Sequence, residues 1–147
     1  MNKTPFITKE QVEEIVKTYP TPFHIYDEKG FMDNAKKVNE AFSWNKGFRE
    51  YFAVKATPNP FIIQKLKEVG CGVDCSSDTE LMIADKLGFR NDEIMFSSNE
   101  TPEGEFAYCN KLGGIINLDD ITMIDFMEKE CGIPETVSCR FNPGGVF

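Results

Sequence analysis

The sequence predicts an α/β fold in which parallel strands alternate with helices, and three observations support this prediction. Five short apolar segments recur along the chain, and their starts lie about 22 residues apart. Helix-capping residues, followed by apolar residues at helical spacing, occupy the intervals. A glycine follows each helical segment, where helices commonly end. This alternation is typical of a parallel sheet covered by helices. The expected strands are 49–55, 71–76, 93–98, 114–119 and 136–141.

Two helices are expected before the first strand, in segments 8–19 and 27–43. Pro20 and Pro22 separate them, because proline has no N–H group to donate within a helix or a sheet. The sequence FHIYD at 23–27 is expected to form a short strand-like piece outside the repeat.

Capping residues mark the start of each helix within the repeat. The side chains of Asn, Ser, Thr and Asp accept hydrogen bonds from the free N–H groups at a helix start, and proline fits the first turn. The expected starts are Asn59–Pro60, Ser77 with Glu80 in a capping box, Thr101–Pro102 and Asp120.

The number of strand–helix units leaves two architectures open, an open sheet or an incomplete barrel. A closed (β/α)8 barrel of the TIM type needs about 250 residues. This chain has 147 residues and about five units, and it ends in RFNPGGVF without a closing helix. We therefore expect a partial (β/α)8 barrel with parallel strands, truncated before the barrel closes.

Composition excludes several classes of partner. The net charge is −8 and the pI is near 4.7, so the chain should repel nucleic acid. No apolar run reaches the roughly 20 residues of a membrane span, and the N-terminus has no apolar signal core, so we expect a cytoplasmic protein with no membrane partner. The five cysteines lack the spacing of a zinc or redox pair, and no metal site is expected.

Polar side chains lie toward the carboxyl ends of the expected strands. Because side chains alternate along a strand, Lys55, Asp74, Asn117 and Arg140 fall on the face opposite the apolar one. Ligands bind at the carboxyl ends of parallel strands, so four polar residues there favour a functional site over a structural layer of ion pairs. Lys55 itself is either a solvated charge or an amine that forms a Schiff base.

The motifs TPFHIYD, YFAVKATPNP, GCGVDCSSDTEL, IMFSSN and CRFNPGG follow one another along nearly the whole chain. In this order they resemble the N-terminal half of the diaminopimelate decarboxylases. These are pyridoxal-phosphate enzymes built on an alanine-racemase-like barrel. The most specific element is AVKA-x-PNP, followed by GVD-x-SS-x-x-EL. The related ornithine and arginine decarboxylases share the lysine strand more loosely.

The resemblance implies a role for four residues. Lys55 looks like the catalytic lysine that binds pyridoxal 5'-phosphate covalently as a Schiff base. Asp74 falls at an aspartate near the cofactor and the lysine, and Arg140 at an arginine beside the cofactor ring. Ala53 falls at a small residue under the cofactor.

The resemblance also implies a domain organisation. Residues 1–26 would form an N-terminal helix and strand that pack against a missing C-terminal β-domain, and residues 27–147 an incomplete barrel that binds pyridoxal phosphate. The full-length protein would be a homodimer that decarboxylates meso-2,6-diaminopimelate to L-lysine in lysine biosynthesis. This chain alone is expected to be inactive, and its unpaired strand edges could cause self-association.

Three other functions stay open from the sequence. One is a non-catalytic barrel that binds pyridoxal phosphate for cofactor homeostasis. Another is a related decarboxylase of ornithine, arginine or carboxynorspermidine. The third is an open α/β binding domain without a cofactor, in which Lys55 is a surface charge.

Overall fold

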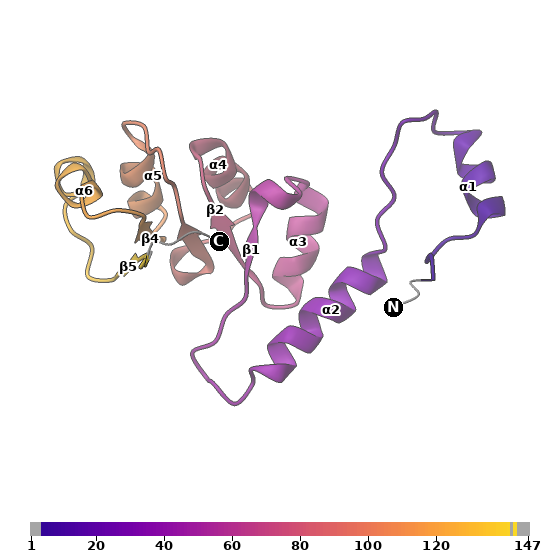
Figure 1. The fold of residues 1–147 in the computed structure, drawn as a ribbon, viewed down its shortest axis with the longest axis horizontal. Helices are drawn as coiled ribbons and strands as arrows, with labels where there is room; N and C mark the ends of the chain where they lie inside the picture. The colour runs from indigo at the N-terminus through magenta and orange to yellow at the C-terminus, as the bar shows by residue number, and fades with distance from the viewer. Residues whose placement is uncertain (1–3, 142, 144–147) are drawn as a thin grey trace.

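A computed structural model describes residues 4–141 and 143, and its centre is one parallel sheet of five strands (Figure 1). The strands pair in the order β1-β2-β3-β4-β5, which is also their order along the chain. Each lies within a segment expected from the sequence but is shorter than that segment. Their bounds are β1 Tyr51–Ala53, β2 Gly72–Cys75, β3 Ile94–Phe96, β4 Ile115–Leu118 and β5 Val137–Cys139. The parallel α/β fold is confirmed, and the sheet of the described strands is not closed, as expected for a partial barrel.

Six α-helices are present in the described residues. Their bounds are α1 Lys9–Val16, α2 Glu28–Ala41, α3 Pro60–Glu68, α4 Asp78–Lys86, α5 Glu105–Lys111 and α6 Met123–Cys131. The described residues also form two short 3-10 helices, η1 Val54–Ala56 and η2 Asn91–Glu93.

Side-chain caps start α3 and α4 as expected, but Ser77 and Glu80 form no full capping box, because the Glu80 carboxylate accepts from the N–H of Ser76 rather than that of Ser77. The Asn59 side chain accepts a hydrogen bond of 3.0 Å from the N–H of Phe61, and Pro60 is the first residue of α3. The Ser77 hydroxyl accepts one of 3.4 Å from the N–H of Glu80. These local bonds satisfy N–H groups that a helix start leaves free.

The starts of the last two helices differ from the prediction. Helix α5 begins at Glu105 rather than at Thr101, because Gly104 before it has a left-handed φ of +92° that a right-handed helix cannot include. Asp120 does not cap α6 directly. Its side chain accepts from the N–H of Thr122 at 2.9 Å and closes a turn ahead of the helix.

Two expected extended segments are also corrected. Residues 23–26 form no strand, since they lie outside the sheet and have no strand to pair with. The expected strand 49–55 ends at Ala53, where its pairing with β2 stops, and Lys55 lies in η1.

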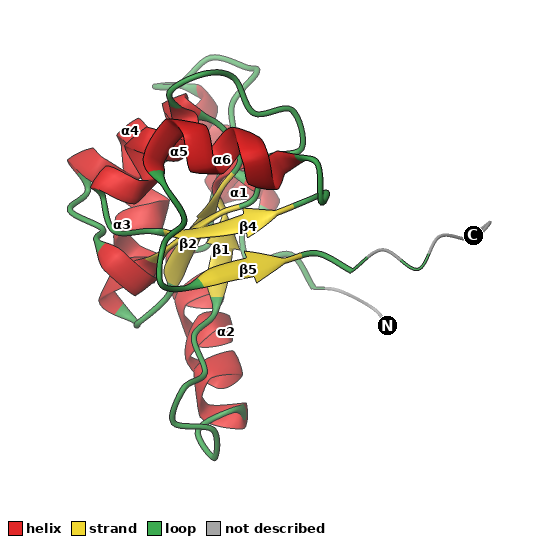
Figure 2. Cartoon of the chain, turned by 90° about the vertical axis from the view of Figure 1, so that its left-hand side faces the viewer, coloured by secondary structure: helices red, strands yellow, loops and turns green. Residues whose placement is uncertain are grey.

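Helices α3 to α6 cover one face of the sheet and leave the other face open (Figure 2). The covered face carries buried apolar side chains from alternate strand positions, as the alternation predicts. They are Val73, Cys75, Ile94, Phe96, Ile116 and Leu118. The intervening residues, such as Asp74 and Asn117, are half-buried on the open face.

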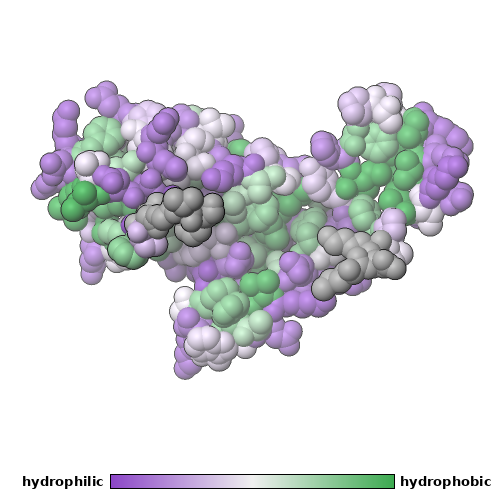
Figure 3. Space-filling model, in the orientation of Figure 1, coloured by the Kyte–Doolittle hydropathy of each residue, from purple (hydrophilic) through white to green (hydrophobic). Residues whose placement is uncertain are grey.

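Helix α1 stands apart from the sheet and contains no buried residue (Figure 1). Large hydrophobic side chains are exposed on and just after α1 and in the loop after α2, including Val16, Tyr19, Phe42 and Trp44. The region of α1 shows hydrophobic colouring in Figure 3. None of the helices in the described ranges has the length and apolar character needed to span a bilayer.

Candidate functional site

The carboxyl ends of β1 and β2 bring the first three expected site residues together. Ala53 and Asp74 are direct partners across the two strands, and both are half-buried on the open face. Lys55 follows two residues after Ala53, in η1. The register of this strand pair therefore places Ala53 beside Asp74 and brings Lys55 to the carboxyl edge of the sheet, two residues further along the chain.

Lys55 lines an open depression of about 290 Å³. The other lining residues come from the loops that follow β2 and β3, and they are Ser76, Ser98, Asn99 and Glu100. The Lys55 side chain is exposed, so its amine is accessible and is not desolvated by the described residues. The structure places this lysine in a polar hollow at the carboxyl edge of the sheet.

Asp74 carries an unsatisfied carboxylate oxygen. Its Oδ1 is buried and has no hydrogen-bond partner among the described residues. Burial raises the pKa of this carboxyl above its ordinary value, and Glu80 raises it further, whereas the Ser97 side chain and the positive charges of Lys55 and Arg140 lower it. A buried acceptor without a partner is unusual in a folded protein and marks a position where a further hydrogen-bond donor fits.

Arg140 follows β5 and continues its pairing with β4, because its N–H donates to the carbonyl of Leu118 at 2.8 Å. Its guanidinium forms an ion pair with Asp119, with 2.5 Å between Nη1 and Oδ1. The charge of Arg140 also acts on the carboxyl of Asp74. The structure therefore brings Lys55, Asp74 and Arg140 to one face and one edge of the sheet.

Several polar residues at this edge were not singled out as site residues. Ser97 accepts a hydrogen bond of 3.4 Å from the side-chain amide of Asn117, and Ser98 is 3% exposed. Asp119 binds Arg140, as described above. Each follows or ends an apolar strand, in the sequences IMFSSN and INLDD, so a polar residue directly after a strand is the signal that could have found them.

The described residues contain no group of three His, Cys, Asp or Glu side chains that could hold a metal ion. His24 is exposed, and its ring stacks on Tyr26 with 6.2 Å between the ring centres.

The residues at this edge fit the cofactor that the sequence resemblance implies. Pyridoxal phosphate requires an accessible primary amine, which Lys55 offers, and a polar surrounding for its ring and phosphate. The buried, unpartnered oxygen of Asp74 and the cationic Arg140 provide complementary groups on the same face.

Residues 30–145 match the family described as "Pyridoxal-dependent decarboxylase, pyridoxal binding domain". Protein TabA of Pseudomonas amygdali pv. tabaci is 43% identical over 136 residues, which are 92% of this chain and 31% of TabA. The diaminopimelate decarboxylase of Thermoplasma acidophilum is 30% identical over 138 residues, which are 94% of this chain and 33% of that enzyme. The chain thus spans about a third of the length of the curated relatives it matches.

Solved structures of the same type superpose on this chain. The diaminopimelate decarboxylase of Helicobacter pylori, complexed with L-lysine, gives a TM-score of 0.65 at 28% identity, with coverage of 80% of this chain and 30% of that one. The ornithine decarboxylase of Entamoeba histolytica gives 0.67 at 27% identity, with coverage of 83% and 39%. The barrel fold of the neighbours and the family match agree with the motifs in the sequence. The chain belongs to the pyridoxal-dependent decarboxylases and matches their pyridoxal-binding domain over residues 30–145.

Proposed function

We propose that the full-length protein is a decarboxylase that uses pyridoxal 5'-phosphate to remove the α-carboxylate of an amino acid with a second, distal amino group. The observation that carries this proposal is the position of Lys55, whose amine is accessible at the carboxyl edge of the sheet beside Asp74 and Arg140. Family membership supports the cofactor and the reaction class.

Each residue has a defined task in this proposal. When bound, pyridoxal phosphate supplies the acceptor for the electrons released as carbon dioxide leaves the substrate. Lys55 binds the cofactor through its side-chain nitrogen and yields that position to the amino group of the substrate. Asp74 places its carboxyl group near the side-chain nitrogen of Lys55, where it can hold either a negative charge or a proton. Ala53 keeps the surface beside Asp74 free of a large side chain.

The Asp119–Arg140 pair adds a fixed positive group on the same edge. Arg140 is oriented by an ion pair of 2.5 Å and by its backbone bond to β4. It balances the charge of Asp74 and presents donors to an anionic group. Guanidinium is suited to such a contact because its N–H groups form a rigid fork.

For the substrate, we propose meso-2,6-diaminopimelate, with L-lysine as the product in lysine biosynthesis. Enzymes named diaminopimelate decarboxylase are similar to this chain at 30–33% identity in Thermoplasma acidophilum, Bacteroides thetaiotaomicron and Helicobacter pylori. The second candidate is another basic amino acid, such as ornithine, arginine or carboxynorspermidine. The ornithine decarboxylase of Entamoeba histolytica, which superposes on this chain with a TM-score of 0.67 at 27% identity, supports this candidate.

The activity requires more chain than these 147 residues in this proposal, so the chain alone should not decarboxylate meso-diaminopimelate. A homodimeric full-length protein, a cytoplasmic location, self-association of this chain through its strand edges, and the packing of residues 1–26 against a β-domain all remain predictions.

Carbon dioxide release by the full-length protein tests the function. The substrates to compare are meso-diaminopimelate, lysine, ornithine, arginine and carboxynorspermidine, each with the wild type and with Lys55→Ala. We expect pyridoxal-phosphate-dependent release from meso-diaminopimelate and at least a ~10³-fold loss in Lys55→Ala, since covalent catalysis needs this amine. Cofactor binding through Lys55 without release from any substrate would instead establish the non-catalytic barrel. If the protein does not bind pyridoxal phosphate at all, the α/β binding domain without a cofactor is the alternative that is supported.

A further inference from the structure

Three carboxylates at equal intervals along the chain accept hydrogen bonds from backbone N–H groups near the carboxyl edge of the sheet. They belong to Glu80 of α4, Glu105 of α5 and Glu130 of α6. The bonds run from the N–H of Ser76 to Glu80 at 2.8 Å, of Asp78 to Glu105 at 2.8 Å, and of Gly104 to Glu130 at 2.7 Å. Glu105 and Glu130 therefore each bind the start of the preceding helix.

Glu105 is the most buried of the three, at 6% exposure. Its Oε1 accepts from Asp78, while its Oε2 is buried with no partner in the described part of the chain. Burial raises the pKa of Glu105, the N–H of Asp78 lowers it, and the nearby carboxylates of Asp78 and Glu130 raise it again. A buried carboxylate among other acids is unfavourable for stability, so its placement needs another explanation.

The Glu105 contact joins the two loops that line the depression around Lys55. The donor, Asp78, lies two residues after Ser76, and Glu105 itself follows the segment 98–100. Within the described ranges, this is the one side-chain hydrogen bond between segments 76–80 and 97–105. The side chain of Glu105 thus adds a second tie between the two loops that form the polar hollow, beyond the backbone bond of 2.8 Å from the N–H of Ser97 to the carbonyl of Cys75.

We propose that Glu105 is a positioning residue for the Lys55 site, which holds Ser76 and the segment 98–100 at the spacing that cofactor binding requires. This inference rests on the proposed function, because it assigns a residue to the same site. Glu105 touches no reacting group and acts only through the N–H of Asp78.

The test measures the affinity of the full-length protein for pyridoxal phosphate by absorbance titration. Loss of a hydrogen bond to a charged acceptor should weaken binding about tenfold in Glu105→Ala. Glu105→Gln retains the acceptor oxygen and removes the buried charge, so it should restore the affinity to within about twofold. The matched control is Glu103→Ala, an exposed glutamate on the same loop, which should bind as the wild type does.

A purely structural role for Glu105 makes a different prediction. It would lower the melting temperature of Glu105→Ala and leave the affinity, measured well below that temperature, unchanged. Unchanged affinity of a folded Glu105→Ala protein would overturn the inference.

A second variant removes the same bond from the donor side and covers the case in which Glu105→Ala fails to fold. Asp78→Pro deletes the N–H at the first residue of α4, where proline is accepted, and the extended Ser77 before it is compatible with proline. Because it also removes the Asp78 carboxylate, its reference is Asp78→Ala, which lacks the carboxylate but keeps the N–H. We expect Asp78→Pro to weaken binding as Glu105→Ala does, and the double variant to bind no more weakly than either single one. Wild-type affinity of Asp78→Pro, or additive losses in the double variant, would contradict the proposal.

The two proposals fail separately. A wild-type protein that does not bind pyridoxal phosphate through Lys55 would overturn the proposed function and this inference together. A wild type that binds it, with Glu105→Ala of equal affinity, would overturn only the role of Glu105.

Discussion

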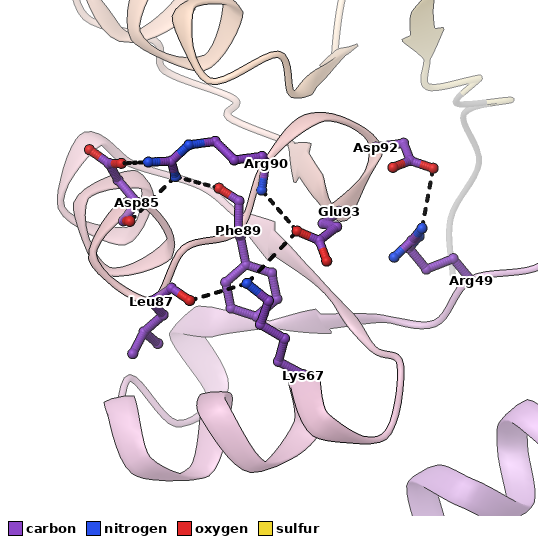
Figure 4. A network of polar contacts seen from close by, with 8 residues as sticks. All are labelled: Arg49, Lys67, Asp85, Leu87, Phe89, Arg90, Asp92 and Glu93. Atoms are coloured by element: carbon purple, nitrogen blue, oxygen red, sulfur yellow. Dashed lines mark hydrogen bonds and ion pairs between the residues drawn. The ribbon is translucent and has the colours of Figure 1, made fainter.

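The two ends of the parallel sheet differ in whether their polar atoms have hydrogen-bond or ion-pair partners. At the amino end, a network of charged side chains and carbonyl groups ties together α3, α4 and the start of β3 (Figure 4). Lys67 lies 3.2 Å from the carbonyl of Leu87 and 4.4 Å from the ring centre of Phe89, and the Arg90 guanidinium lies 2.5 Å from Asp85. Every side chain with a charge in this network has a partner.

At the carboxyl end, buried polar atoms stand without partners. Asp74 Oδ1, Thr101 Oγ1 and Glu105 Oε2 are buried and accept no hydrogen bond within the described ranges. They belong to β2, to the loop between β3 and α5, and to the first residue of α5, respectively. No buried atom of this kind belongs to the network at the amino end.

From this difference we infer that the amino end of the sheet stabilises the fold and that the carboxyl end binds the ligand. Buried unsatisfied groups cost free energy and are rare unless a ligand or a further part of the protein completes them. Local rules of stability are commonly broken at functional sites. Substitutions at the amino end should therefore lower stability without changing cofactor binding, and substitutions at the carboxyl end should weaken cofactor binding without lowering stability.

The largest effect on stability is expected from Phe89→Ala at the amino end. Phe89 is completely buried, and removal of its ring leaves a cavity that should lower the free energy of unfolding by about 3–5 kcal/mol. Urea unfolding of the full-length protein measures the change, and a titration with pyridoxal phosphate at low temperature should give wild-type affinity. A decrease of less than about 1 kcal/mol in the free energy of unfolding, or a weaker cofactor affinity of the folded variant, would contradict the assignment of the amino end to stability alone.

A smaller loss of stability is expected from Lys67→Met. Methionine keeps an apolar stem against Phe89 but removes the cation above the ring and the donor to Leu87. The cost should be about 1 kcal/mol. Glu93, at 3.9 Å from the ammonium, still accepts from the N–H of Arg90 at 2.9 Å and is not left without a partner. Equal stability of wild type and variant at low and high salt would show that the network at the amino end contributes nothing measurable.

The smallest effect on stability, with the opposite sign, is expected from Asp74→Asn at the carboxyl end. Since burial raises the pKa of Asp74 above its ordinary value of 3.8, the neutral form is favoured in the folded protein. The contribution of this group to stability is therefore present below pH 3.8 and is lost as the pH rises through the raised pKa.

Asp74→Asn should accordingly be as stable as the wild type in acid and more stable at neutral pH, by less than about 1 kcal/mol after solvent screening. Unfolding curves at several pH values measure the difference, and cofactor affinity should fall in the same variant. A variant that is less stable than the wild type at neutral pH would show that the Asp74 carboxylate is a structural group.

The sequence was sufficient to predict the five parallel strands of the fold and the face on which its polar residues lie. The alternation of Val73 and Cys75 with Asp74 identified the buried face, because a strand presents side chains to opposite sides. The left-handed Gly104, which delays α5, could not be predicted, since a glycine adopts either sign of φ and the neighbouring turn decides between them.

Contacts between loops could not be predicted from the sequence either, because they depend on the tertiary structure. Lys55 was expected within a strand, but β1 stops where its pairing with β2 stops, and pairing is a tertiary property. The bond from Asp78 to Glu105 joins residues that are far apart in the chain and follows no local pattern. The motif that contains Lys55 identified the residue, whereas the loops that surround it required the structure.

The central claim is that the Lys55 amine is the attachment point of the cofactor. Reduction of the full-length protein loaded with pyridoxal phosphate by borohydride, followed by peptide mass mapping, tests it most directly. We predict one reduced cofactor per chain, located on Lys55, with no label in Lys55→Ala and none on the helix lysines Lys65 and Lys67, which serve as internal controls. Label distributed over surface lysines, or unchanged labelling after Lys55→Ala, would contradict the account.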